Sequence, residues 1–375
     1  MDFNLSDEQK QLKESVTAFT KKEIEPLAHK MDREGKIPDP LIKKMANMGL
    51  LGMTLPLAYG GAGASDLDCA LAVEALAYSG TGVWWLVAFT ASIPACVVTF
   101  GSEEQKQSYL RPVVEGSMIP SIQFTEPETG SDPKAITTTL VPEEDHYLIT
   151  GAKRFSTFAN RKGYALVYGK DETDQISAFL VPKFLTGYSV GKAFELMGSG
   201  GIESCDVYYD GVRISSANLL GKKGRGMEIL LRWIADEKIQ QCAACVGLAQ
   251  AALDEAIGFS KTRKIRKKVQ ADFQGIRWMI ADMYSQLEAA RWLTYRTAFL
   301  KGTDSPGWMT QAAATKNFVV PAVLNIVDIS RRIHGSYGYT REFKIERLYR
   351  AAAGASVIAV SNEINKSIVG AALVT

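Results

Sequence analysis

The spacing of apolar residues changes twice along this chain, and that change limits the possible folds more than any other feature. Up to about residue 117 apolar residues recur at every third or fourth position, as in LIKKMANMGLLGM, which is typical of amphipathic helices. Short β-branched and aromatic runs then alternate with turn residues, which predicts antiparallel strands. The helical spacing returns afterwards. We therefore expect a helical domain at residues 1–117, a β domain at 118–222 and a helical bundle at 223–375.

The last region contains the longest helical patterns, which favour a four-helix bundle with antiparallel neighbours. The outer faces of such helices are suited to packing against copies of the chain, so we expect an oligomer. The β region lacks the alternation of strands and helices that builds a nucleotide-binding sheet. The glycine-rich loops at 196–204 and 219–228 also lack the spacing of a nicotinamide-binding motif, so we interpret both as turns.

Charge and composition exclude several classes of protein. The chain has 43 Lys+Arg and 41 Asp+Glu, and its net charge of +2 gives no broad positive field for nucleic acid or anionic membranes. The first twenty residues lack the basic start and apolar core of a secretory signal. The apolar stretch 83–100 is interrupted by Thr90, Ser92 and Pro94. We therefore expect a cytoplasmic protein without a membrane span.

Cysteine and histidine are too few and too scattered to indicate a metal site. Five cysteines, an odd number, also argue against a disulfide scaffold. Cys242 and Cys245 form a CxxC pair, but they fall within the helical run QQCAACVGLAQAALDEA and no second pair lies nearby. We interpret them as small residues that pack between helices, and we expect no metal.

Two short segments near the start of the β region carry candidate binding chemistry. The first, FTEPETGSD, begins at Phe124 and combines hydroxyl side chains with Pro and Gly, so its hydroxyls and backbone N–H groups suit a phosphate or the edge of a heterocycle. Such clusters also occur in ordinary turns. The second, KRFST, covers residues 153–157, and the combination of both segments is more specific than either one.

These segments resemble motifs of the acyl-CoA dehydrogenase family of flavoproteins. The resemblance covers nearly the whole chain, because PLAYGGAGAS, FGSEEQKQSYL, LLGKKGRGME, GLAQAALDEA, IHGSYGYTRE and IERLYR follow in the family's order. It implies a helical N-terminal domain, a central antiparallel β-barrel-like domain and a C-terminal four-helix bundle, assembled as a homodimer or homotetramer. It also implies FAD, an acyl thioester substrate, and an electron-transferring flavoprotein as redox partner.

The resemblance assigns FAD contacts within one subunit to the two segments. Thr125 and Thr157 are expected to hydrogen-bond the edge of the isoalloxazine ring, and Phe124 precedes Thr125 in the same motif. Phe155 takes the place of an aromatic residue that lies against the ring. Ser131 matches a residue that touches the FAD phosphates.

Three further positions match residues that support the cofactor from elsewhere. Arg263 and Gln274 correspond to side chains that reach the FAD of a neighbouring subunit. Without the resemblance, the basic run at 261–268 would be interpreted as a solvated helix end. Glu363 matches a position near the cofactor.

The catalytic position departs from the family pattern. Most members carry a carboxylate that removes the α-proton after the IERLYR segment, but that position is Ala359 here. Some members place the base on the first long bundle helix instead, and the matching residue is Glu237. Asp236 lies on a different face of that helix. The alternative interpretation of Glu237 is a surface carboxylate paired with a cation, and Glu363 is a third candidate for which cofactor support is favoured.

Other departures affect the cofactor and the substrate. Arg266, Arg332 and Ser336 replace an aromatic residue, a glutamine and a glycine of the family motifs. The two arginines either strengthen the grip on a pyrophosphate or indicate a different or missing cofactor. The segment 83–90, which lines the acyl pocket in the family, is aromatic and uncharged, which favours an apolar or small acyl group. Buried core is the competing interpretation for Trp84 and Trp85.

The leading hypothesis is FAD-dependent α,β-dehydrogenation of an acyl thioester, or the reverse reduction, with Glu237 as an atypical base. The thioester is carried by CoA or by an acyl-carrier protein, which present the same pantetheine arm. A non-redox relative that performs elimination or only binds the thioester is the first alternative. Oxidation of a carrier-bound polyketide extender unit is the second.

Overall fold

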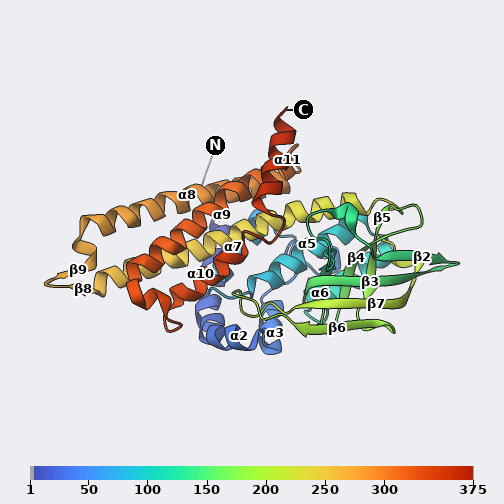
Figure 1. Cartoon of the computed structure of the whole chain (residues 1–375), viewed down its shortest axis with the longest axis horizontal. Coiled ribbons are helices and arrows are strands. Elements are labelled where there is room, and N and C mark those ends of the chain that lie inside the picture. The colour runs from blue at the N-terminus through green and yellow to red at the C-terminus, as the bar shows by residue number, and fades with distance from the viewer. Residues whose placement is uncertain (1–3, 375) are drawn as a thin grey trace.

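The computed structural model describes residues 4–374 and consists of three parts that follow one another along the chain (Figure 1). Helices form the N-terminal part, a sheet forms the middle part, and long helices form the C-terminal part. The sheet lies toward one end of the long axis, while α7, α8 and α9 extend to the other end. The predicted fold is therefore confirmed.

The described residues of the N-terminal part form six α-helices: α1 (Asp7–Phe19), α2 (Ala28–Glu34), α3 (Asp39–Asn47), α4 (Asp66–Ala77), α5 (Trp84–Phe100) and α6 (Glu103–Val114). Three of them begin with a capping box, in which a serine and the residue three positions later satisfy each other's backbone N–H groups. The box predicted at the SDEQ segment is the first, with Ser6 and Gln9. Helix α5 has no charged residue and is buried along most of its length, so it forms the centre of this part.

The middle part is a seven-stranded, mainly antiparallel sheet. Its strands are β1 (Ser121–Gln123), β2 (Thr139–Glu143), β3 (His146–Thr157), β4 (Tyr164–Lys170), β5 (Ile176–Pro182), β6 (Tyr188–Ala193) and β7 (Ser204–Ser215). The order is β1-β4-β2-β3-β7-β6, with β5 paired to β4, and β1 runs parallel to β4. The β3–β7 register shifts between Lys153 and Ser156, so β3 bulges there.

The C-terminal part is built on three long helices. Its elements are α7 (Gly226–Thr262), β8 (Lys264–Ile265), β9 (Lys268–Val269), α8 (Gln274–Gly302), α9 (Trp308–His334), α10 (Lys344–Gly354) and α11 (Asn362–Val374). Helices α7, α8 and α9 pack on one another, α10 packs on α7 and α9, and α11 packs on α9. Helix α7 also contacts α4 and α5, which joins the bundle to the N-terminal part.

The interior of the bundle explains two features of the sequence. Cys242 and Cys245 are buried free thiols in the bundle core, as their helical position predicts. Two stretches, Gly226–Thr262 and Trp308–Tyr339, are long and apolar enough to cross a membrane by length and composition. Both are mostly buried within the protein, as core helices of soluble proteins are.

Candidate active site

A buried ion pair joins the two binding segments that the sequence singles out. Lys153 Nζ donates to Glu126 Oε1 at 2.8 Å, and both side chains are almost completely buried. The backbone and hydroxyl groups of Thr137 and Thr138 also donate to the Glu126 carboxylate, at 2.6–3.0 Å. Burial alone would raise the pKa of Glu126, but Lys153 and these hydrogen bonds lower it to about 2. Glu126 therefore organises the FTEP segment, a role that the sequence did not indicate.

The predicted flavin contacts lie next to each other, because the loop that carries Thr125 runs beside strand β3, which carries Phe155 and Thr157. Arg154 N donates to Thr125 O at 2.8 Å, so the Thr125 segment lies beside β3. At the bulge of β3, Phe155 adopts a left-handed backbone conformation with φ of 54° and is 57% exposed. Among residues 4–374 neither the Thr125 nor the Thr157 hydroxyl has a hydrogen-bond partner, and both residues are half-buried. An exposed ring beside free hydroxyls fits a flat, hydrogen-bonding heterocycle, and these residues are thus compatible with FAD.

The other predicted cofactor residues of this region lie in different surroundings. The Phe124 ring packs edge-on against Tyr168 in the core, and its carbonyl accepts from Lys153. Ser131 is exposed in the loop before β2. Glu363 is exposed in the first turn of α11.

Arg263 and Gln274 lie at the end of the molecule opposite the sheet (Figure 1). Arg263 ends α7, where its guanidinium stacks over the Tyr337 ring at 5.3 Å, and Gln274 begins α8. Both are exposed. One chain therefore does not bring these two residues to Thr125 and Thr157.

Glu237 lies in the interior, on α7. Its side chain is 3% exposed, and no residue in the described part of the chain gives it a hydrogen bond or an ion pair. The alternative interpretation as a surface carboxylate paired with a cation is therefore wrong. Burial raises the pKa of Glu237 to about 8, although Lys316 and Lys238 act in the opposite direction.

The neighbouring carboxylate is already engaged. Asp236 Oδ1 lies 2.6 Å from Lys301 Nζ, which also contacts Asp66 at 2.6 Å. This buried network raises the pKa of Lys301, although burial opposes the shift. Of the two adjacent acids, Glu237 alone is free for proton transfer.

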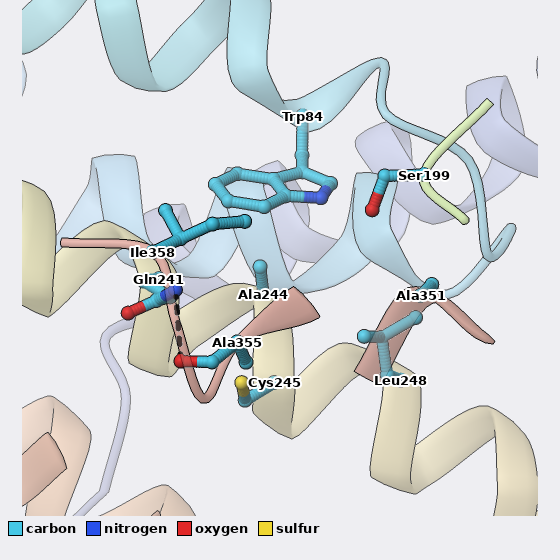
Figure 2. Close-up of a pocket in the computed structure, with 9 residues that line it drawn as sticks. All are labelled: Trp84, Ser199, Gln241, Ala244, Cys245, Leu248, Ala351, Ala355 and Ile358. Atoms are coloured by element: carbon cyan, nitrogen blue, oxygen red, sulfur yellow. Dashed lines mark hydrogen bonds between the residues drawn. The ribbon is translucent and has the colours of Figure 1, made fainter. Parts of the chain in front are cut away.

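A small cavity lies against α7 (Figure 2). It has space of about 10 Å³, roughly one water molecule. Its lining residues come from α5, α7, α10 and two loops: Trp84, Ser199, Gln241, Ala244, Cys245, Leu248, Ala351, Ala355 and Ile358. Glu237 does not line the cavity itself, but it lies one helical turn before the lining residue Gln241, and Ala244 and Leu248 continue the same helical spacing.

The Trp84 ring covers one side of this cavity, as Figure 2 shows. It stacks on Trp85 at 4.4 Å, and Trp85 contacts Phe89, whose ring lies 6.2 Å from that of Trp233. Trp84 and Trp85 are both buried. An aromatic block thus fills the space between α5 and the part of α7 that precedes Glu237.

The segment that carries Ala359 borders the cavity through Ile358. Lys316 of α9, which is completely buried, donates to the carbonyls of Ile358, Ala359 and Val360. Lys238 is also buried, without a hydrogen bond or ion pair to any residue between 4 and 374, and burial lowers its pKa to about 8. Sequence reasoning missed both lysines. For Lys316 the available signal was a lysine within an apolar helical run, whereas Lys238 lies among polar and charged residues.

No group of three or more His, Cys, Asp or Glu among the described residues is arranged to hold a metal ion. The candidate site has two parts: the flavin-compatible face at Thr125, Phe155 and Thr157, and the buried centre at Glu237.

Family models for all three domains match the chain. They are the acyl-CoA dehydrogenase N-terminal domain at residues 6–117, the middle domain at 121–212 and the C-terminal domain at 224–374.

Individual relatives match over almost the whole length. The chain is 31% identical to an acryloyl-CoA reductase (NADH) of Anaerotignum propionicum, over 98% of this chain and 95% of the relative. It is 32% identical to the caffeyl-CoA reductase-Etf complex subunit CarC of Acetobacterium woodii, over 98% of both. The solved structure of butyryl-CoA dehydrogenase from Megasphaera elsdenii is 30% identical and covers 100% of both chains with a TM-score of 0.97. This chain therefore belongs to the acyl-CoA dehydrogenase family of flavoprotein oxidoreductases, which act on the CH–CH bond of acyl thioesters.

Proposed function

We propose that this enzyme interconverts an acyl thioester and its α,β-unsaturated form, with Glu237 as the group that moves the α-proton. The observation that carries this proposal is the position of Glu237, which is buried on α7 one helical turn before the cavity-lining residue Gln241 and has no hydrogen bond or ion pair to any described residue. The methyl group of Ala359 has no proton-transfer chemistry. Bound FAD supplies the donor or acceptor of the hydride at the β-carbon.

The protonation state of Glu237 suits the reductive step. With a pKa of about 8, the side chain is largely a neutral acid near pH 7. A neutral acid donates its proton to the α-carbon of an unsaturated thioester and becomes a carboxylate. Dehydrogenation is the reverse step, in which the carboxylate takes that proton. Relatives of both kinds are similar to this chain, an acryloyl-CoA reductase and a butyryl-CoA dehydrogenase among them, which agrees with a reaction that runs in either direction.

The proposed working unit is a homodimer or homotetramer that shares its FAD sites between subunits. Arg263 and Gln274 lie far from Thr125 within one chain (Figure 1), so a neighbouring copy is needed to bring them to a cofactor. Helix α8 exposes large aromatic residues that a second copy can cover: Trp278, Tyr284 and Phe299. Ser131 and Glu363 are proposed to contact the cofactor from exposed positions.

We further propose a cytoplasmic enzyme whose thioester is carried by CoA or an acyl-carrier protein. An electron-transferring flavoprotein is the proposed redox partner. The similarity to a subunit of a caffeyl-CoA reductase-Etf complex supports that partner.

A short acyl group is the proposed substrate, because the Trp84 ring closes one side of the cavity and would limit how far an acyl chain extends there. We expect Trp84→Ala to raise kcat/KM for an eight-carbon thioester relative to a four-carbon one by about 10-fold or more, since each accommodated methylene contributes binding energy. Steady-state kinetics with a chain-length series measures the ratio. Trp85→Phe, which keeps the Trp84 ring in place, is expected to leave the preference unchanged. An unchanged ratio in Trp84→Ala would remove Trp84 from the acyl pocket.

Anaerobic titration of the purified flavoprotein tests the proposed function. Addition of a saturated acyl thioester is expected to bleach the flavin absorption, and the reduced enzyme is expected to regain it with an unsaturated thioester. Product analysis by mass spectrometry identifies the two-hydrogen change. A protein that binds the thioester without any change in absorption, or that purifies without flavin and eliminates a group from the thioester, would support the non-redox alternative instead.

A further inference from the structure

Lys316 makes an unusual set of contacts for a buried lysine. An ammonium group has three N–H donors, and those of Lys316 go to three consecutive backbone carbonyls. The distances to Ala359 O and Val360 O are 3.2 and 2.5 Å. No carboxylate in the described part of the chain forms an ion pair with it. The charge of Lys316 is therefore solvated by backbone dipoles and is not neutralised by an acid.

The segment that Lys316 holds is conformationally unfavourable. Ala359 and Val360 have φ values of 51° and 72°, in the left-handed region. That region is disfavoured for residues with a Cβ, and most of all for a β-branched residue such as Val360. Such a conformation persists when surrounding contacts determine it. The three Lys316 hydrogen bonds are contacts of this kind. Just before this segment, Gln241 donates a hydrogen bond to Ala355 O at 3.3 Å.

The same lysine acts on Glu237 from the facing helix. Asp236 and Lys238 of α7 and Lys316 of α9 are the charged groups that influence Glu237, and Lys316 has the largest electrostatic effect. Helix α5 and the segment 356–361 contain no charged side chain. Asp236 is already paired with Lys301. Helix α9 packs directly on α7, and Lys316 and Glu237 are both buried. Lys316 therefore contacts the cavity-bordering segment from a helix that packs against the one carrying Glu237.

We propose that Lys316 is a positioning residue of this active site, which fixes segment 358–360 beside the cavity and holds a positive charge near Glu237. The electrostatic half of this inference rests on the proposed role of Glu237, whereas the positioning half does not. A purely structural role would require only the hydrogen bonds and would leave the pH dependence of the reaction unchanged.

Two replacements separate these roles. Lys316→Met removes both the hydrogen bonds and the charge, whereas Lys316→Gln removes the charge but keeps a donor. Lys183→Met is a matched control, because Lys183 is another buried lysine that donates to three carbonyls, those of Ile119, Phe158 and Arg161. Lys183 directly follows β5, in the turn that leads to β6 in the middle part of the chain.

Hydrogen exchange of the full-length protein, measured by mass spectrometry, tests whether Lys316 fixes segment 358–360. The peptide that contains residues 356–361 is expected to exchange at least about 10-fold faster in Lys316→Met than in wild type, and its protection by a bound four-carbon thioester is expected to be lost. Lys183→Met is expected to leave this peptide unchanged. Wild-type exchange of the peptide in Lys316→Met would overturn the positioning role.

The pH profile of kcat/KM reads the electrostatic half. A positive charge lowers the pKa of a nearby carboxyl. Removal of the Lys316 charge is therefore expected to move the limb of the profile that reports the titration of Glu237 to higher pH, by about one unit in both Lys316→Met and Lys316→Gln. Lys183→Met is expected to keep the wild-type limb. An unmoved limb in Lys316→Gln would overturn the electrostatic role. The Glu237→Gln variant identifies the limb: if it persists there, the assignment of Glu237 fails, while the exchange result still decides the positioning role.

Discussion

Replacement of Glu237 by glutamine is expected to lower kcat with an acyl thioester by about 10²–10⁴-fold, the contribution of a positioned general acid or base. Glutamine has nearly the same shape as glutamic acid, so packing on α7 is preserved. It neither donates nor accepts the α-proton, and Ala359 offers no replacement. Single-turnover absorption measurements on the flavin-loaded enzyme check this, because they separate the chemical step from product release.

Asp236→Asn is the matched control for this result. It removes the neighbouring carboxylate, which pairs with Lys301 and does not belong to the cavity face. We expect lower stability but turnover within a few-fold of wild type. Equal losses of turnover in both variants would place the effect in the packing of α7 and would contradict proton transfer by Glu237.

The Glu237→Gln replacement is also expected to change the stability of the protein, independently of the reaction. The pKa of Glu237 is raised from 4.5 to about 8 in the folded protein by burial. Between these two values the native state binds more protons than the unfolded state, so the free energy of unfolding falls as pH rises through that window. Glu237→Gln is expected to reduce this fall. Thermal unfolding of the two proteins between pH 5 and pH 8 measures the difference.

The sequence predicted the architecture because hydrophobic spacing and capping residues are local properties. The capping box at Ser6 and the helical setting of Cys242 and Cys245 both appear in the structure as predicted. The choice of Glu237 followed from the resemblance to family members that carry the base on this helix, but its burial did not. Burial depends on which helices pack against α7, among them α4, α5 and α9, and this is a property of the tertiary fold.

The contacts that organise the site were beyond sequence reasoning for the same reason. Lys316 is more than forty residues from the carbonyls it holds, and Lys153 is 27 residues from Glu126. Many lysines and glutamates are available at such separations, and only the folded arrangement selects one pair. The predicted roles of Arg263 and Gln274 need a second copy of the chain, so one folded chain leaves them as predictions.

Loss of Lys153 is expected to have the largest effect on stability. Lys153→Met leaves the Glu126 carboxylate buried without its cation, which costs about 3–5 kcal/mol of unfolding free energy. Because Glu126 and Lys153 hold the Thr125 segment beside β3, FAD affinity is expected to fall as well. Denaturant unfolding and flavin retention during gel filtration measure the two effects. Lys170→Met, which breaks the more exposed contact with Asp174 in the same sheet, is expected to cost less than about 1 kcal/mol.

A double replacement distinguishes the loss of the ion pair from the loss of lysine packing. Glu126→Gln combined with Lys153→Met removes both charges, and the single amide oxygen at 126 still accepts hydrogen bonds from one of the two threonines, Thr137 or Thr138. The double variant is expected to be more stable than Lys153→Met alone, because the uncompensated charge is gone. Equal stability of the two variants would show that Lys153 acts through its packing. The FTEP and KRFST segments would then owe their alignment to the β3 bulge and the Arg154–Thr125 hydrogen bond instead of the buried pair.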